Sequence, residues 1–212
     1  MNILLLGATG AIGSRILNEA VQRGHHVTAV ARHAEKLQDS KQVKVVSADA
    51  GDAGKMQALM QGQDAVVSSL SPRGENGVEQ YLAAIRSILQ AAEASPIGYA
   101  LFVGGMSNIK AADGERLLDK MLPTVPETMR PELITVAKAR EMIEKSNVNW
   151  SFFCPGGMIE PGQRTGKFRL GGETALFQFG EKTRISMEDY AVAVLDELEH
   201  PQYEKQVFHI CY

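Results

Sequence analysis

Three glycines near the start of the chain are spaced for holding a dinucleotide. Gly7, Gly10 and Gly13 stand in the segment 7–13, Gly-Ala-Thr-Gly-Ala-Ile-Gly, which directly follows the apolar run 3–6. In a strand–turn–helix unit the first glycine allows the tight turn, the second lets backbone approach a pyrophosphate, and the third packs helix against strand. The helix start adds free N–H groups and a positive dipole end, so the pattern favours a phosphate cradle over a glycine-rich turn without a ligand. The expected cradle residues are Gly7, Thr9, Gly10, Ala11, Ile12 and Gly13.

Position 32 bears on the choice between NAD and NADP. Domains that bind NAD usually carry an acidic residue about 20 positions beyond the glycines, on the ribose 2′-hydroxyl. This chain has Arg32 there, and the stretch 28–33 contains no carboxylate. A guanidinium is a planar fork of donors that suits a 2′-phosphate, so we expect NADP, the alternative being a solvated surface arginine. Asp49 is the candidate acceptor for the adenine amino group, or else a plain turn residue, whereas Asp52 is expected to cap the next helix.

The elements that must position these residues alternate along the chain. Short apolar runs predict buried strands, and longer segments with helical spacing of apolar residues predict covering helices. The expected strands are 3–6, 27–31, 43–46, 64–70, 99–103, 150–154 and 206–210. The expected helices are 12–23, a short one around 56–60, 78–94, 133–145 and 188–199. This order predicts an α/β doubly wound parallel sheet, the Rossmann fold, with residues 1–212 as a single dinucleotide-binding domain.

Two long segments interrupt the alternation. Residues 106–131 contain three prolines, and residues 156–186 are rich in glycine. Both follow the carboxyl ends of late strands, where open α/β sheets bind ligands, and loops of this length are usually functional. We therefore expect substrate-side insertions that build a small C-terminal substrate lobe. Its apolar roof is expected to come from Met158, Phe168, Phe177 and Phe179.

Composition narrows the class of partner. The 212 residues carry a net charge of -3 with no block of lysine and arginine, which argues against nucleic acid. No apolar stretch approaches the roughly 18–20 residues of a membrane span, so we expect no membrane partner and a cytoplasmic location. Cys154 and Cys211 are expected to be free thiols, and no set of histidines, cysteines and carboxylates has metal spacing, so no metal is expected. The remaining partner is a small-molecule substrate, bound by a monomer or homodimer.

The combination of motifs resembles the short-chain dehydrogenase/reductase superfamily, in its atypical branch. That branch includes NADH-flavin reductases, biliverdin-IX-beta reductase and nitrogen-metabolite-regulator-like sensors. The matching segments are 7–13, 31–32, 102–107, 137–141, 149–156 and 184–191. The resemblance implies that Lys138 bonds the cofactor ribose and that Ser107 occupies the place of the superfamily's helper serine. Further cofactor contacts are expected at the ends of later strands, from Ser69, Leu70, Gly104 and Pro155.

The chain departs from the superfamily at its catalytic tyrosine. That tyrosine normally stands four residues before the lysine, but residue 134 is isoleucine, and Cys154-Pro155 replaces the usual arginine-proline. Hydride transfer to a conjugated acceptor depends more on positioning than on a strong side-chain acid. We therefore expect an NADP(H)-dependent reductase of a flavin-like or quinone-like molecule, with Ser107 and Lys138 as catalytic candidates. A non-catalytic NADP(H)-binding redox sensor is the alternative, and sugar-nucleotide epimerase or dehydratase chemistry is a weaker one.

Overall fold

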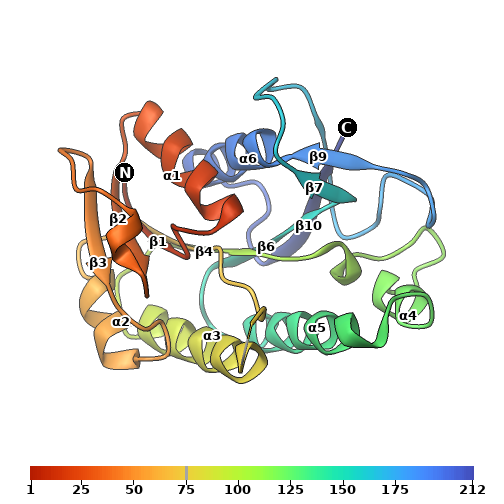
Figure 1. Cartoon of the computed structure of the whole chain (residues 1–212), viewed down its shortest axis with the longest axis horizontal. Coiled ribbons are helices and arrows are strands. Elements are labelled where there is room, and N and C mark those ends of the chain that lie inside the picture. Colours follow the sequence, from red (N-terminus) through yellow and green to blue (C-terminus); the bar gives the residue numbers. More distant parts are fainter. Residues whose placement is uncertain (75) are drawn as a thin grey trace.

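The computed structural model describes residues 1–74 and 76–212 and centres on an eight-stranded sheet (Figure 1). The strand order is β3-β2-β1-β4-β5-β6-β10-β8, and every pairing is parallel except that of β8 with β10. The strands are β1 (Asn2–Leu6), β2 (His26–Ala31), β3 (Val43–Ser47), β4 (Ala65–Ser68), β5 (Tyr99–Val103), β6 (Trp150–Pro155), β8 (Arg169–Gly171) and β10 (Gln206–Cys211). The order reverses direction between β1 and β4, as expected for a doubly wound sheet.

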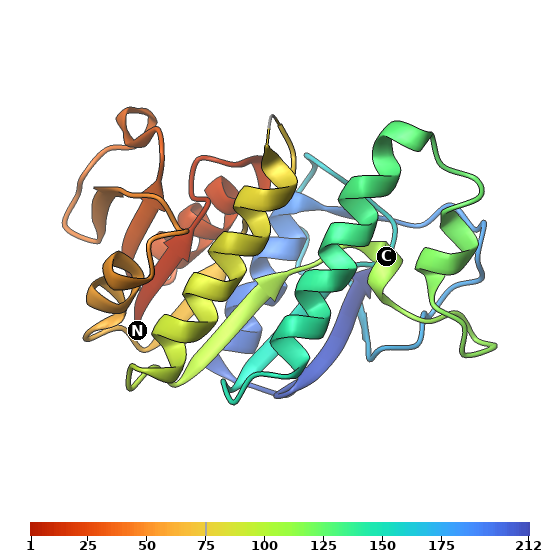
Figure 2. The ribbon, with the colours of Figure 1, turned by 90° about the horizontal axis from the view of Figure 1, so that it is seen from below.

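Helices cover both faces of this sheet (Figures 1 and 2). On one face α1 (Ala11–Gln22) packs against α6 (Met187–Glu199). On the other face α3 (Gly77–Glu93) lies between α2 (Ala53–Met60) and α5 (Arg130–Glu144). The expected Rossmann-type fold is confirmed. Within residues 1–74 and 76–212, no helix combines the length and the apolar character needed to cross a bilayer.

The alternation of side chains along β1 explains how one apolar run supports two layers. Successive side chains of a strand point to opposite faces of the sheet. Ile3 and Leu5 therefore pack in the core under α1 and α6, while Leu4 and Leu6 pack in the core under α2, α3 and α5. A strand buried on both faces needs apolar residues at every position, which is why the run shows no polar alternation.

The two insertions contain short elements that the sequence pattern did not predict. Residues 106–131 form a 3₁₀ turn at Met106–Asn108 and the helix α4 (Leu117–Met121). Residues 156–186 contribute β8 and a separate parallel pair, β7 (Met158–Glu160) with β9 (Arg184–Ser186). Elements of three to five residues are too short to show the spacing of apolar residues that identifies a helix or a strand. The insertions are joined to each other, because the Lys110 N–H donates to the Glu173 carbonyl at 2.8 Å and the Ala175 N–H donates to the Lys110 carbonyl at 2.8 Å.

The segment before β8 is fixed to α1 and α6 by buried carboxylates. Arg164 donates two hydrogen bonds of 2.8 Å to Glu19 on α1. Asp189 on α6 accepts from the backbone N–H groups of Thr165 and Gly166 at 2.7 and 2.8 Å. Burial alone would raise the pKa of Asp189, but the Thr165 hydroxyl and these backbone donors hold it below the usual range, so the carboxylate stays charged. The motif 184–191 therefore has a clear structural role, which is to anchor this late segment.

Candidate functional site

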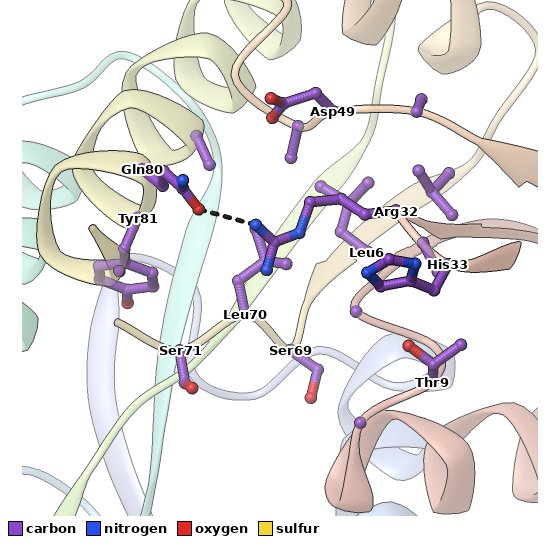
Figure 3. Close-up of a pocket in the computed structure, with 18 of the residues that line it drawn as sticks. Leu6, Thr9, Arg32, His33, Asp49, Ser69, Leu70, Ser71, Gln80 and Tyr81 are labelled. Atoms are coloured by element: carbon purple, nitrogen blue, oxygen red, sulfur yellow. Dashed lines mark hydrogen bonds between the residues drawn. The ribbon is translucent and has the colours of Figure 1, made fainter. Parts of the chain in front are cut away.

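A cavity of about 250 Å³ lies at the carboxyl ends of β1, β2, β3 and β4 (Figure 3). Its wall is formed by the glycine turn after β1, the ends of β2 and β3, the segment after β4 and one face of α3. The reversal of strand order between β1 and β4 opens this space, because the connections on the two sides run to opposite faces of the sheet. The predicted residues that line it are Gly7, Thr9, Gly10, Arg32, Asp49, Ser69 and Leu70.

The glycine turn is fixed by close backbone contacts. Gly7 has φ +81°, and a Cβ there would lie 2.5 Å from the Ser69 carbonyl oxygen. A Cβ at Gly13 would overlap the Gly7 carbonyl, so a side chain at either position would push the turn off the sheet. These contacts agree with the roles expected for a tight turn and for helix–strand packing.

The first turn of α1 presents backbone donors beside the cavity. Gly10 is the N-cap residue and has no side chain to cap the helix, and no acidic residue stands in the first turn. The N–H groups of Ala11, Ile12 and Gly13 belong to this turn, where a helix has no backbone acceptors of its own. A pyrophosphate would supply those acceptors and would interact favourably with the helix dipole.

Arg32 extends across the cavity from the end of β2. Figure 3 shows its side chain reaching toward α3, where Nη1 donates a hydrogen bond of 2.7 Å to Oε1 of Gln80. Arg73 also lines the cavity and pairs with Glu132 at 3.0 Å, and Asp49 is the one carboxylate among the described lining residues. The wall therefore carries more positive than negative charge, which suits a ligand with several phosphates.

Asp49 lies in the turn between β3 and α2. Its Oδ1 accepts a hydrogen bond of 2.8 Å from the Gly51 N–H, so one oxygen shapes the turn while the residue also lines the cavity. Asp52 caps α2 by accepting from the Lys55 N–H at 2.9 Å, as the sequence predicted.

The other predicted site residues lie outside this cavity wall. Ser107 is only 2% exposed, and its hydroxyl oxygen accepts a hydrogen bond of 3.3 Å from the Asn108 amide. Lys138 is exposed on α5, two turns from the start of that helix. Gly104 follows β5, and Pro155 is buried at the end of β6, where it pairs with β10. The structure therefore brings together the predicted residues at the ends of β1 to β4 but does not bring these four residues into the same cavity.

Sequence reasoning missed the contribution of α3. Gly77, Gln80, Tyr81 and Ala84 line the cavity at the spacing of one helix face. Tyr81 is buried, and burial raises the pKa of its phenol far above the usual range, so the hydroxyl keeps its proton. No hydrogen bond to this hydroxyl is formed within the described part of the chain. The available signal was the polar pair Gln80-Tyr81 within an otherwise apolar helix face.

A second group of residues connects the late insertions to α5. Arg140 is 5% exposed and donates to Glu144 at 2.7 Å, to the Asn108 carbonyl and to Glu173, which also pairs with Lys110 at 2.7 Å. Burial alone would lower the pKa of Arg140, but the two carboxylates raise it, so the guanidinium remains charged. Arg140 thereby holds the turn containing Ser107 against the segment around Glu173.

The expected aromatic roof is wrong in one member. Phe177 is buried in the core and packs edge-on against His209, with ring centroids 6.0 Å apart. The β8–β10 pairing draws the segment after β8 over the end of the sheet and buries this ring. Phe168 is half-buried, whereas Met158 and Phe179 are exposed. Cys154 is a buried free thiol whose pKa is raised to about 12 by burial, which makes it a core residue rather than a nucleophile.

Comparisons with known proteins identify the family of this chain. Residues 7–201 match the model of a family described as NAD(P)H-binding. The uncharacterized protein YwnB of Bacillus subtilis strain 168 is 32% identical over 214 residues, covering 98% of this chain and 97% of YwnB. A structure from Bacteroides thetaiotaomicron, provisionally described as an epimerase, is 36% identical with a TM-score of 0.86, covering 100% of this chain and 96% of that one.

A further structure is SP1627 of Streptococcus pneumoniae TIGR4, provisionally described as an NADH-flavin reductase. It is 27% identical to this chain with a TM-score of 0.86, and the match covers 100% of this chain and 99% of SP1627. The resemblance to the atypical branch of the short-chain dehydrogenase/reductase superfamily is confirmed, and the chain belongs to its NAD(P)H-binding family.

Proposed function

We propose that this protein binds NADP(H) and transfers hydride from it to a flavin-like or quinone-like small molecule. The observation that carries the proposal is the juxtaposition of the glycine turn and Arg32 on one cavity at the switch point of the sheet. The reduced nicotinamide would supply the hydride, and the acceptor would take one further proton from water. Such an acceptor delocalises the added charge, so the isoleucine at position 134 is compatible with turnover.

Each half of the cofactor has proposed contacts. The first turn of α1 would hold the pyrophosphate, Arg32 the 2′-phosphate and Asp49 the adenine amino group. Ser69 and Leu70 would form the wall between them. For the nicotinamide half we retain the sequence-based candidates as proposals, namely Gly104, Ser107, Lys138 and Pro155.

The provisional description of SP1627 as an NADH-flavin reductase supports the choice of acceptor. The provisional description of the Bacteroides structure as an epimerase points to another chemistry. Epimerases of this superfamily use the tyrosine that is isoleucine here, so we favour reduction.

A redox sensor is the second candidate, and one observation favours it. The hydroxyl oxygen of Ser107 is held by Asn108, and Lys138 lies outside the cavity, so neither side chain is positioned beside the glycine turn. A protein that binds NADP(H) and regulates a partner needs the cradle but no proton relay. This hypothesis shares the cofactor site with the reductase and differs only in turnover.

Turnover and binding measured together separate the two candidates. Oxidation of NADPH is followed by its absorbance with purified protein and a panel of FMN, FAD, a benzoquinone, a naphthoquinone and a small aldehyde. The reductase predicts steady turnover with flavins or quinones and none with the aldehyde. Saturable NADPH binding without turnover of any acceptor would support the sensor instead.

A further inference from the structure

Gln80 fixes one end of the bond that spans the cavity. Its backbone N–H donates to the Asn76 carbonyl at 3.1 Å in the first turn of α3. The start of this helix is closely packed, since a Cβ on Gly77 would overlap the Pro72 carbonyl. The backbone of Gln80 is therefore fixed at the start of α3, while its side chain, like that of Arg32 at the end of β2, is exposed.

The acceptor on Gln80 is neutral, and this matters for a charged ligand. A guanidinium has five N–H donors, and the bond to Gln80 uses one of them. A carboxylate in the same place would pair with Arg32 and compete with a phosphate for its charge. The amide oxygen instead orients the guanidinium over the cavity and leaves its charge available.

We propose that Gln80 is a positioning residue that sets the preference for NADPH over NADH by holding Arg32 across the adenosine end of the cavity. This inference rests on the proposed function, in which Arg32 binds the 2′-phosphate. Gln80 acts on that phosphate through Arg32, so its effect requires Arg32 to be present. Figure 3 shows the two side chains meeting between β2 and α3, with Asp49 on the α2 side of the same cavity.

Binding of NADPH and of NADH is measured by calorimetry for the wild type, Q80E, Q80A, R32A and the double variant R32A/Q80E. We expect Q80E to raise the Kd of NADPH about 10-fold and that of NADH by less than about 2-fold, because the new carboxylate pairs with Arg32. Q80A should lower the discrimination by a smaller factor, about 3-fold, because it frees the guanidinium without neutralising it. In the R32A background, Q80E should leave the ratio of the two Kd values unchanged within about 2-fold.

Q90E is the matched control, since it adds the same charge to an exposed position near the other end of α3. It should leave the ratio of the two Kd values unchanged. Preference is expressed as the Kd of NADH divided by the Kd of NADPH. A Q80E variant that keeps the wild-type value of this ratio would overturn the role of Gln80, and so would one that lowers the ratio equally with and without Arg32. If R32A still lowers the ratio, the proposed cofactor assignment survives that result. A wild-type protein without preference for NADPH would overturn both.

Discussion

Replacing Arg140 with methionine tests how the late insertions are held in place. The guanidinium is buried and reaches three acceptors, one on the 3₁₀ turn, one on α5 and one in the segment after β8. Methionine preserves much of the apolar stem and removes all of the donors. The structure predicts a loss of stability concentrated at the junction of the two insertions.

The size of the loss follows from what each acceptor retains. The Asn108 carbonyl loses a charged donor in a buried place, which costs about 1.5–3 kcal/mol. Glu144 is one-third exposed and regains water, so its share is about 0.5–1 kcal/mol. Glu173 keeps Lys110 at 2.7 Å, which limits its share to about 1 kcal/mol. We expect a total of about 3–5 kcal/mol and a fall in Tm of about 6–20 °C for a chain of this length.

Denaturant unfolding followed by circular dichroism gives the free energy, and limited proteolysis locates the change. Cleavage should become faster within 105–116 and 172–176, where the bonds to Arg140 are lost. R116M is the matched control. Arg116 pairs at 3.6 Å with Glu141, which lies on α5 as Arg140 does, but this ion pair is exposed. That variant should lose less than about 1 kcal/mol. An R140M protein within 1 kcal/mol of the wild type would refute the reasoning.

Two further predictions concern other buried groups. His209 accepts from the Leu176 N–H at 3.2 Å on Nε2, and burial lowers the pKa of its ring, so the folded state holds it neutral. Its contribution to stability is therefore present above about pH 6.5 and is lost as the pH falls below the lowered pKa of the folded state. H209Q should make the free energy of unfolding less dependent on pH below about pH 6.5. An H209Q protein with the wild-type pH dependence in denaturant titrations would count against this. Y81F should raise the Kd of NADPH about 5-fold, because one neutral donor is lost from the cavity wall. The free energy of unfolding should change by less than about 1 kcal/mol. Unchanged affinity in calorimetry would show that the phenol does not contact the cofactor.

The strands and the long helices could be predicted because their patterns extend over many residues. The run 3–6 is buried on both faces, and two of the glycines that follow it, Gly7 and Gly13, have backbone contacts that exclude side chains. These are local constraints, and they leave a direct trace in the sequence. The doubly wound order then follows from the alternation of strands and helices.

The parts that could not be predicted depend on contacts between distant segments. The sequence predicts Phe177 in the apolar roof of the substrate lobe, yet pairing of β8 with β10 buries it against His209. The burial of Arg140 has no local signal, because two of its acceptors come from positions 32 residues earlier and 33 residues later. Gln80 and Tyr81 belong to a helix whose apolar pattern indicates only a core face. The polar pair distinguishes them from the rest of that face, but their position on the cavity follows from the packing of α3 beside the segment after β4.

The most direct test of the account is NADPH binding by the G10D variant. A Cβ at Gly10 approaches only the Gly7 carbonyl, at 3.2 Å, which must move by a few tenths of an ångström, while aspartate is a favourable N-cap residue. Folding of the variant is therefore checked by circular dichroism before binding is measured. Its carboxylate would stand where the pyrophosphate is expected and repel it. N18D adds the same charge to an exposed position farther along α1 and serves as the control. We predict saturable NADPH binding by the wild type and by N18D, and a Kd raised by at least about 100-fold in a folded G10D protein. Equal affinity in all three proteins would contradict the placement of the cofactor on the glycine turn.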